Sequence, residues 1–364
     1  MVFRRHSANK KIIFRQRVSD KDLLIFTRIL LTLLKARLPL DRALLITRDQ
    51  TENEFFRGIL SSIHHDVTAG VPLSQALAKH PRTFRPVYVN LVRAGETSGQ
   101  LPEMLARVYA FQEKSIALKS KIITALAYPI VVLLVSFLIL GAFLIYLVPR
   151  LKSTILKHGT ALPLPTRVVL GISDFLTHNL FTFPNNLLLL ISSVVLIYLL
   201  TRTRNIPQFQ EFRDRFLLRT PIWGALLTKT LTARFASTLA LLMASGVNIV
   251  DALAVVSQVL ENVVFMRTAQ SIESAISQGI SFSQALSDQE LFPKLMSELS
   301  AAGEETGELP EMLVQAAEFF ESEVDLTLRI FTAVLEPIAI VFIVALLGGV
   351  VISLYLPMLK IRTV

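Results

Sequence analysis

The carboxylates that could do chemistry in this sequence lie in two near-identical segments. Residues 94–105 read AGETSGQLPEML, and residues 302–313 read AGEETGELPEML. The acidic side chains of the two segments are Glu96, Glu103, Glu304, Glu305, Glu308 and Glu311. Grouped carboxylates can bind a divalent cation, contact a basic partner, or work as a general acid and base.

Catalysis is not expected at these acids, because no nucleophile and no substrate-binding motif accompanies them. The sequence has no cysteine, which removes thiol nucleophiles, thiolate metal sites and disulfides. Its six histidines lack metal-binding spacing, and no phosphate-binding glycine loop occurs, so nucleotide energy would come from a separate protein. We therefore predict no enzyme, no catalytic residue, no cofactor and no metal. The candidate ligands, should a cation bind, are Glu96, Glu103, Glu304 and Glu311.

A structural interpretation of the same segments is favoured over a functional one. We predict that Gly95 and Gly303 end a helix in the left-handed conformation, and that a later glycine provides the turn. The following Leu-Pro-Glu suits a first helical turn, where proline fits and the helix dipole favours an anion. The alternative is contact with a basic partner surface. The candidate contact residues are Gly99, Glu304, Glu305, Gly307 and Glu308.

The repeat extends far beyond the acidic segments. Tyr128-Pro129-Ile130 recurs as Glu336-Pro337-Ile338 at the same offset of 208, whereas residues 26–44 match residues 235–253 at an offset of 209. Similarity at a fixed offset over such a length is the mark of an internal duplication. The chain therefore holds two copies of one module.

Three uncharged, apolar runs predict membrane-spanning helices. The chain is 52% hydrophobic and 18% charged, less charged than the quarter or so of a typical soluble domain. As a helix, the first run would be about 42 Å long, more than a bilayer core of roughly 30 Å requires. The first and third runs are equivalent in the repeat, and the second is an insertion. Two spans between the modules place both modules on one side of the membrane.

Apolar positions at three- and four-residue spacing predict helices in each module, with Pro39 and Asn248 opening equivalent second helices. We predict an all-α, polytopic membrane protein with two homologous cytoplasmic helical bundles, of about six helices each, and three transmembrane helices. The expected order is a basic N-terminal segment (1–20), helical domain 1 (21–121), transmembrane helix 1 (122–149), a short periplasmic loop (150–179), transmembrane helix 2 (180–201), helical domain 2 (202–336), transmembrane helix 3 (337–359) and a short periplasmic tail (360–364).

Charge is unevenly divided between the halves. Residues 1–121 hold 21 Lys and Arg against 10 Asp and Glu, whereas residues 202–336 hold 10 against 17. The basic start of the chain is better explained by anionic lipid and by orientation toward the cytoplasm than by nucleic acid. Positive charge in the first loop argues against this orientation, at Arg150, Lys152, Lys157 and Arg167. The even number of spans between the two modules decides the matter in favour of a cytoplasmic location for both. No secretory signal peptide is recognised.

Several blocks resemble one known family, the type II secretion system F protein, which also forms the platform of type IV pilus and competence systems. They are the duplicated acidic segment, Leu162 to Thr166 with Ser173-Asp174-Phe175, and a block from Pro221 to Leu253 that contains Ala233-Arg234-Phe235 and Ser245-Gly246-Val247. The resemblance covers nearly the whole chain. It departs from the family at the short N-terminal preamble and at Arg37, where glycine is common.

The resemblance implies a bacterial inner-membrane scaffold that couples a cytoplasmic assembly ATPase to the extraction of pilin or pseudopilin subunits. It also implies contacts with other inner-membrane assembly proteins and with lipid, and a homo-oligomer that is a dimer or larger. An alternative is the membrane subunit of an ATPase-driven transporter, a permease, although uncharged spans disfavour a solute pathway.

Overall fold

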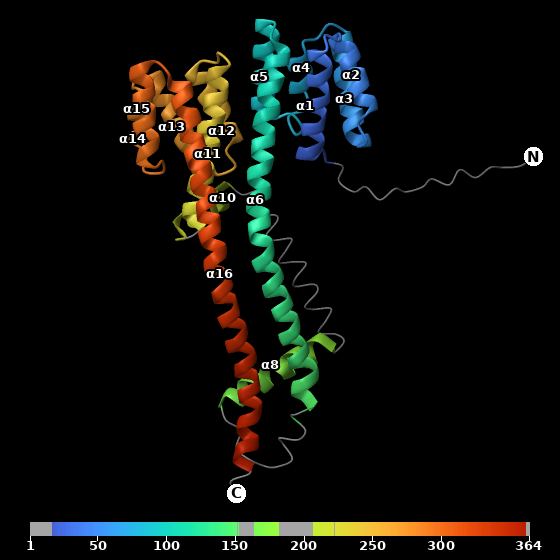
Figure 1. Ribbon diagram of the computed structural model, residues 1–364, viewed down its shortest axis with the longest axis vertical. Coiled ribbons are helices and arrows are strands. Elements are labelled where there is room, and N and C mark those ends of the chain that lie inside the picture. The colour runs from blue at the N-terminus through green and yellow to red at the C-terminus, as the bar shows by residue number, and fades with distance from the viewer. Residues whose placement is uncertain (1–16, 151, 153–163, 182–206, 222, 362–364) are drawn as a thin grey trace, which may run out of the picture. The chain divides into compact units, whose positions relative to one another are not determined.

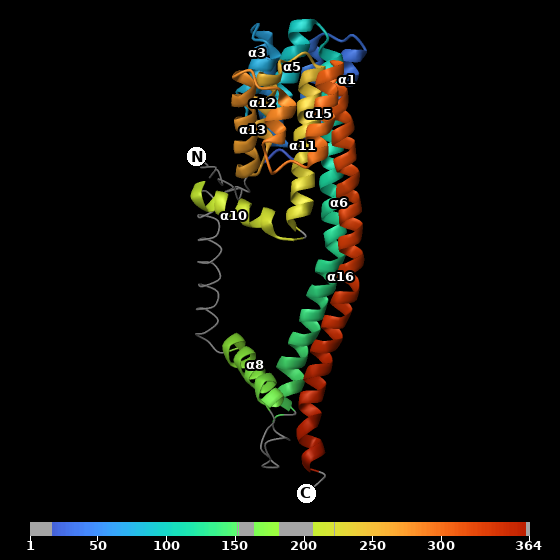
Figure 2. The same cartoon turned by 90° about the vertical axis from the view of Figure 1, so that its left-hand side faces the viewer.

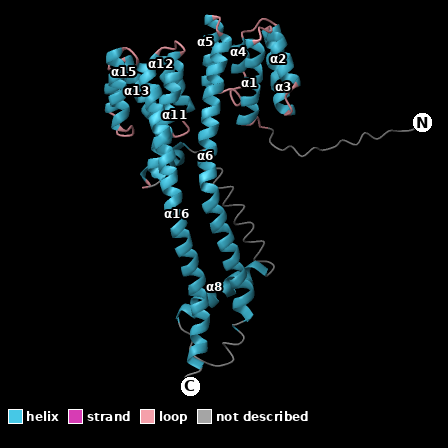
Figure 3. Ribbon diagram, viewed as in Figure 1, coloured by secondary structure: helices cyan, strands magenta, loops and turns pink. Residues whose placement is uncertain are grey.

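The computed structural model describes residues 17–150, 152, 164–181, 207–221 and 223–361, and all regular structure in these ranges is helical (Figures 1 and 3). It divides into two compact units. One unit joins Met1–Lys119 with Thr230–Phe320, and the other joins Ser120–Lys229 with Glu321–Val364. We call residues 20–119 the first module and residues 230–320 the second module.

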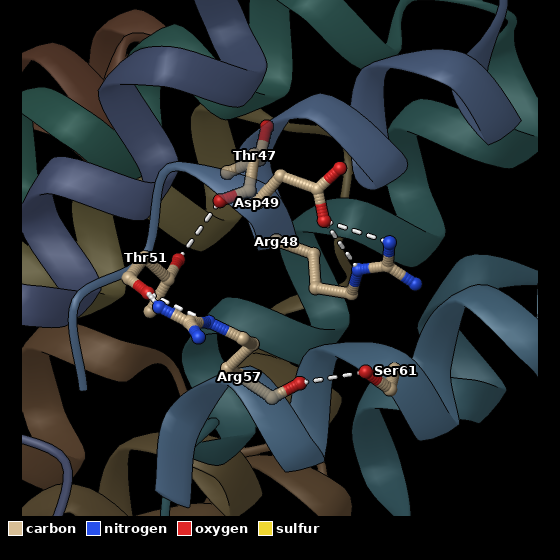
Figure 4. Close-up of polar contacts among 6 residues, drawn as sticks. All are labelled: Thr47, Arg48, Asp49, Thr51, Arg57 and Ser61. Carbon is tan, nitrogen blue, oxygen red and sulfur yellow. Dashed lines mark hydrogen bonds and ion pairs between the residues drawn. The ribbon is translucent and has the colours of Figure 1, made fainter. Parts of the chain in front are cut away.

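The helices of the first module follow one another through short turns. They are α1 (Asp20–Lys35), α2 (Leu40–Asp49), α3 (Glu54–Thr68), α4 (Leu73–Ala78), α5 (Pro86–Ser98) and the start of α6 (Leu101–Ala142). Ser19 begins α1 with a capping box, in which its hydroxyl accepts the Asp22 N–H and its own N–H donates to the Asp22 carboxylate. The turn before α3 is fixed by Arg57, whose guanidinium donates to the Thr51 carbonyl at 2.6 and 3.0 Å (Figure 4).

The second module repeats this order. Its helices are α11 (Trp223–Ala244), α12 (Ile249–Val259), α13 (Val263–Ser277), α14 (Phe282–Ser287), α15 (Lys294–Thr306) and the start of α16 (Leu309–Ile361). Asn248 caps α12 as the sequence predicts, and its side chain accepts the Val250 N–H. The offset between copies falls from 209 to 208 between α14 and α15, because that loop is one residue shorter than the loop between α4 and α5.

The same aromatic core stabilises both modules. In the first, the ring of Phe26 lies 5.5 Å from Phe56 and 5.8 Å from Phe84, and all three side chains are buried. The equivalent rings of the second module also pack together, with centroids 4.7 and 5.5 Å apart. These rings are Phe235, Phe265 and Phe292. Burying such rings contributes about 2–3 kcal/mol each, so the three form the centre of each bundle.

One helix end departs from its copy. α11 ends in a Schellman motif whose left-handed position is Gly246, with φ of 83°. α1 ends in the same motif, with Arg37 at φ of 61° and the Leu38 N–H donating to the Leu33 carbonyl. Arg37 is thus the one described non-glycine residue held in the left-handed conformation. This strain is the physical consequence of an arginine at the position where the second copy has Gly246.

Among the residues that the structure describes, two helices are long and apolar enough to cross a membrane, namely Leu101–Arg150 and Leu309–Ile352. Only 6% of the most apolar window of the first helix, and none of that of the second, is buried within the chain. Within the second unit the two helices run side by side in Figures 1 and 2, and Phe137 contacts Phe342 with ring centroids 6.4 Å apart. Apolar surface of this extent needs lipid or another apolar partner.

Shorter helices complete the second unit. A π-helical turn, η1 (Phe143–Leu147), follows α6 and packs against α8 (Leu164–Phe181), where the Ser173 hydroxyl donates to the Leu144 carbonyl at 2.5 Å. α8 occupies much of the predicted loop 150–179. The helix α10 (Pro207–Arg219) directly precedes α11 in the sequence.

Several predicted segments lie outside the described residues. The structure does not describe residues 182–201 of the predicted second span. It also does not describe residues 1–16 of the predicted basic segment or residues 362–364 of the predicted tail.

Candidate functional site

The first glutamate of each acidic segment points into its own module. The Glu96 carboxylate accepts the backbone N–H groups of Leu73 at 2.5 Å and Ser74 at 3.1 Å, at the start of α4. Glu304 does the same for α14, where it accepts the N–H of Phe282 at 2.6 Å and that of Ser283 at 3.1 Å. The two N–H groups at the start of α4 have no acceptor within that helix, and Glu96 of α5 supplies one. The carboxylate therefore ties two helices together.

This arrangement favours the structural interpretation of Glu96 and Glu304. The first N–H groups of a helix have no partner within the helix, and an anion there also interacts favourably with the helix dipole. Pro72 before α4 has no side-chain group that could accept these N–H groups, so the cap comes from α5 instead. A carboxylate used in this way has both oxygens engaged within the protein.

The predicted role of Gly95 and Gly303 is wrong. Both lie inside helices, α5 and α15, which continue to Ser98 and Thr306. A Cβ atom on Gly95 would lie 2.9 Å from the Cα of Leu101, and one on Gly303 would lie 2.8 Å from the Cα of Leu309. These glycines therefore permit close approach of the next helix rather than a left-handed turn.

Gly99 and Gly307 provide the turn itself. They end α5 and α15 in the left-handed conformation, with φ of 72° and 75°. The following Leu-Pro-Glu begins α6 and α16 as predicted, with Glu103 and Glu311 in the first turn. The turn thus folds the last helix of each module tightly back against the preceding one.

The remaining acids differ between the two copies. Glu305, Glu308 and Glu311 are exposed, whereas the positions equivalent to Glu305 and Glu308 in the first module are the uncharged Thr97 and Gln100. The exposed acids Glu305 and Glu308 are therefore specific to the second module, whereas Glu311 has an exposed equivalent in Glu103. Within the part of the chain that the structure describes, no group of three or more His, Asp or Glu side chains has the arrangement of a metal site.

Glu103 has a local partner. Its carboxylate lies 3.1 Å from the Arg107 guanidinium, one turn along α6, and the other end of that guanidinium donates to the Ala244 carbonyl at 2.7 Å. Arg107 therefore connects the first acidic segment to the end of α11. Both groups belong to one compact unit.

Basic residues of α6 face acidic residues of α16. Lys114 lies 3.5 Å from Glu318 and Lys121 lies 2.6 Å from Asp325, a spacing of seven residues on both helices. The two pairs therefore lie along one face, as in a coiled coil. Each pair is largely exposed and contributes little stability alone, so its importance is in setting register.

The partners in these ion pairs are 204 residues apart, whereas equivalent positions of α6 and α16 are 208 apart. The pairs therefore join non-equivalent positions of the two helices, about one helical turn apart, which long side chains can bridge between neighbouring parallel helices.

The modules also meet at Glu261, which sequence reasoning missed. Its carboxylate lies 3.8 Å from Arg85 of the first module and 3.5 Å from Arg234 of the second, beside the contact of α5 with α12. The excess of basic residues in the first half and of acidic residues in the second was the only signal for these pairs, and it did not identify the partners.

The candidate site joins neighbouring helices within each module. Half-buried carboxylates cap the short helices α4 and α14, close-packed glycines hold the last helix of each bundle, and that helix continues into a membrane-length apolar segment. This defines a membrane protein built by duplication of a helical module.

Comparison with known sequences identifies the family. The profile of the type II secretion system (T2SS), protein F, matches residues 26–149 and 235–357, one match in each copy. The chain belongs to this family.

Several curated relatives match along most of their length. The type IV pilus assembly protein PilC of Thermus thermophilus is 40% identical over 342 residues, which cover 94% of this chain and 82% of the relative. The type IV pilus assembly protein PilC of Pseudomonas aeruginosa is 32% identical, with coverage of 96% and 92%. The type II secretion system protein F of Pseudomonas aeruginosa is 31% identical, with coverage of 97% and 85%.

Proposed function

We propose that this chain is the inner-membrane platform of a type IV pilus or type II secretion machine, and that it acts as a scaffold without catalysis of its own. Membership of the protein F family and the names of the relatives support this role. In this proposal two six-helix domains lie in the cytoplasm, and three helices, at 122–149, 180–201 and 337–359, span the membrane.

The observation that carries the proposal is the continuity of α6 and α16. Each helix begins at the glycine turn of its bundle and continues without interruption into an apolar segment. A displacement applied to either bundle would therefore be passed along a continuous helix into the bilayer. A cytoplasmic assembly ATPase would supply that displacement, and pilin or pseudopilin subunits at the apolar helices would receive it.

The exposed acids of the second module are the proposed ATPase contact. Glu305 and Glu308 flank Gly307 on a rigid turn, so their carboxylates would be presented in a fixed geometry to a basic partner surface. Glu304, by contrast, is engaged with α14 and serves to hold the turn. Other inner-membrane assembly proteins, lipid and further copies of the chain would surround the apolar helices.

Charge reversal tests the ATPase contact. The double variant Glu305→Lys with Glu308→Lys should reduce co-purification of the ATPase and filament assembly while the protein still inserts in the membrane. The matched control is Thr97→Lys with Gln100→Lys, which adds charge at the equivalent turn of the first module. Unchanged co-purification and assembly in the first variant, or equal losses in both, would contradict the proposed contact.

A further inference from the structure

The helix α10 carries an exposed aromatic face. Phe209, Phe212 and Phe216 are 40, 70 and 60% exposed, and the rings of the last two are stacked 6.4 Å apart. Since successive helical residues are rotated by about 100°, the three rings fall within roughly 60° of one another. Asp214, on the opposite side of the helix, is only 3% exposed. The rings therefore project from the protein rather than into its core.

A tight corner fixes the direction of α10. The Gly224 N–H donates to the Thr220 carbonyl at 2.8 Å, and a Cβ on Gly224 would lie 2.1 Å from the Leu218 carbonyl oxygen. Because no larger residue fits at Gly224, the start of α11 lies close to the end of α10.

The start of α11 is in turn attached to α16. The ring of Trp223 packs on Phe331 with centroids 5.3 Å apart, and the Lys229 ammonium donates to Glu323 at 2.8 Å and to the Thr327 hydroxyl at 3.0 Å. These contacts all lie within one compact unit. They place the corner beside Phe331.

The level of Phe331 is close to the start of the apolar run. Six residues separate it from Pro337, where that run begins, and this corresponds to about 9 Å along a helix. Figure 2 shows α10 lying crosswise to α16. If α16 crosses a bilayer, α10 therefore lies along its surface, with its aromatic side chains at headgroup depth.

The charges of α10 match an anionic surface. Arg215 and Arg219 border the aromatic face on one side and Arg213 borders it on the other, as expected from the helical rotation. The buried Asp214 carboxylate is paired with Arg213 at 2.8 Å. Arg215 is paired in the same way with Glu211 at 3.1 Å, so α10 carries three arginines against two acids. Its outward surface combines aromatic rings with flanking guanidinium groups, the composition of a helix that lies in a membrane interface.

We propose that α10 is an interfacial helix that inserts Phe209, Phe212 and Phe216 among anionic phospholipids at the cytoplasmic surface. It would hold the start of α11 at the membrane surface while α16 passes into the bilayer. The proposal rests on the membrane placement of α16 and on the cytoplasmic location of the second module, but not on any role in filament assembly. Its failure would leave the charge-reversal result at Glu305 and Glu308 unaffected, so the two are distinguishable.

Tryptophan fluorescence of the full chain in lipid nanodiscs tests the proposal. Trp223 is the only tryptophan in the sequence, so Trp223→Phe gives a silent background. Phe212→Trp on that background is the probe. Phe55→Trp, on the exposed surface of the first module, is the aqueous reference, and Phe342→Trp, in the apolar segment of α16, is the deep reference.

Quenchers of known location then report the surroundings of each probe. The discs contain phosphatidylethanolamine and phosphatidylglycerol, with nitroxide lipids labelled near the headgroup or near the end of the acyl chain, and acrylamide is the aqueous quencher. We expect the Phe212→Trp probe to be quenched most by the shallow lipid label, at a depth of about 5–10 Å. Adding Arg219→Glu should shift the probe toward water in these discs and leave it in place in discs of phosphatidylcholine.

Two results would overturn the proposal. Quenching of the Phe212→Trp probe by acrylamide, as at the aqueous reference, would mean that the aromatic face is in water. Protection from both acrylamide and the lipid labels would mean that a protein surface, such as a second copy of the chain, covers α10.

Discussion

Removal of the Glu96 charge tests whether this carboxylate caps and holds α4. Glu96→Gln keeps the shape of the side chain, but an amide has one acceptor oxygen and places an NH₂ group where the second backbone N–H now donates. A hydrogen bond to a charged group contributes about 1.5–3 kcal/mol. Because one of the two bonds to α4 is lost and the other becomes neutral, we expect local destabilisation of about 2 kcal/mol.

That loss should be confined to α4 and its surroundings. Since 1.4 kcal/mol is a factor of ten, the opening equilibrium of α4 should rise about 30-fold. Hydrogen exchange followed by mass spectrometry on peptides that cover Leu73–Ala78 measures this directly. Peptides from α14 in the second module should exchange as in the unmodified protein, because Glu304 still caps that helix.

Glu103→Gln is the matched control. Glu103 belongs to the same segment but is exposed and contacts Arg107 only one turn away, so its loss should cost about 0.5 kcal/mol or less. The reasoning is refuted if Glu96→Gln leaves the exchange of α4 unchanged, or if the control increases it equally. Either result would mean that the cap is not what holds α4.

Further substitutions and acid test other parts of the account. Arg37→Gly should stabilise the chain by about 1 kcal/mol in thermal unfolding, because it relieves a left-handed arginine, and no gain would mean that the strain is absent. Gly303→Ala should destabilise by about 1–3 kcal/mol through contact with the next helix, whereas Gly58→Ala, with open space around it, should not; equal effects would refute the close approach. A hydrogen bond from Lys119 lowers the pKa of Asp20, so this contact stabilises α1 fully above about pH 4 and weakens as the pH falls through the lowered value. The opening of α1, measured by hydrogen exchange and corrected for the intrinsic rate at each pH, should therefore rise with acid, and Asp20→Asn should reduce that dependence to the part that Asp22 contributes.

Much of each bundle follows from local sequence. Three- and four-residue apolar spacing, Pro39, Asn248 and the Leu-Pro-Glu starts predict the helices, because capping and amphipathicity act over a few residues. The repeat adds the equivalence of the two copies. All of this is information that neighbouring residues carry.

Other features depend on contacts distant in sequence. Glycine is common both at helix ends and where two backbones approach, so spacing alone could not separate the role of Gly95 from that of Gly99. Glu96 binds N–H groups 22 and 23 residues earlier in the chain, and nothing beside it indicates that target. The ion pairs between α6 and α16 could likewise not be predicted, because they depend on pairing between helices from the two halves.

Arg37 is an instructive intermediate case. Its departure from the glycine expected from the family resemblance marked the position, but only the backbone angle of 61° gives the reason. The residue occupies the same position in its motif as Gly246. A difference between the two copies of a repeat can therefore locate strain before its cause is known.

The central claim is that both modules lie on the cytoplasmic face, and labelling of single cysteines tests it most directly. The sequence has no cysteine, so Thr97→Cys and Glu305→Cys introduce unique labels at equivalent, exposed positions of the two turns. Leu164→Cys, in the predicted periplasmic loop, is the control. With a membrane-impermeant maleimide, intact spheroplasts should label only the control, and both turn positions should react after permeabilisation. Labelling of either Thr97→Cys or Glu305→Cys in intact spheroplasts would contradict the account.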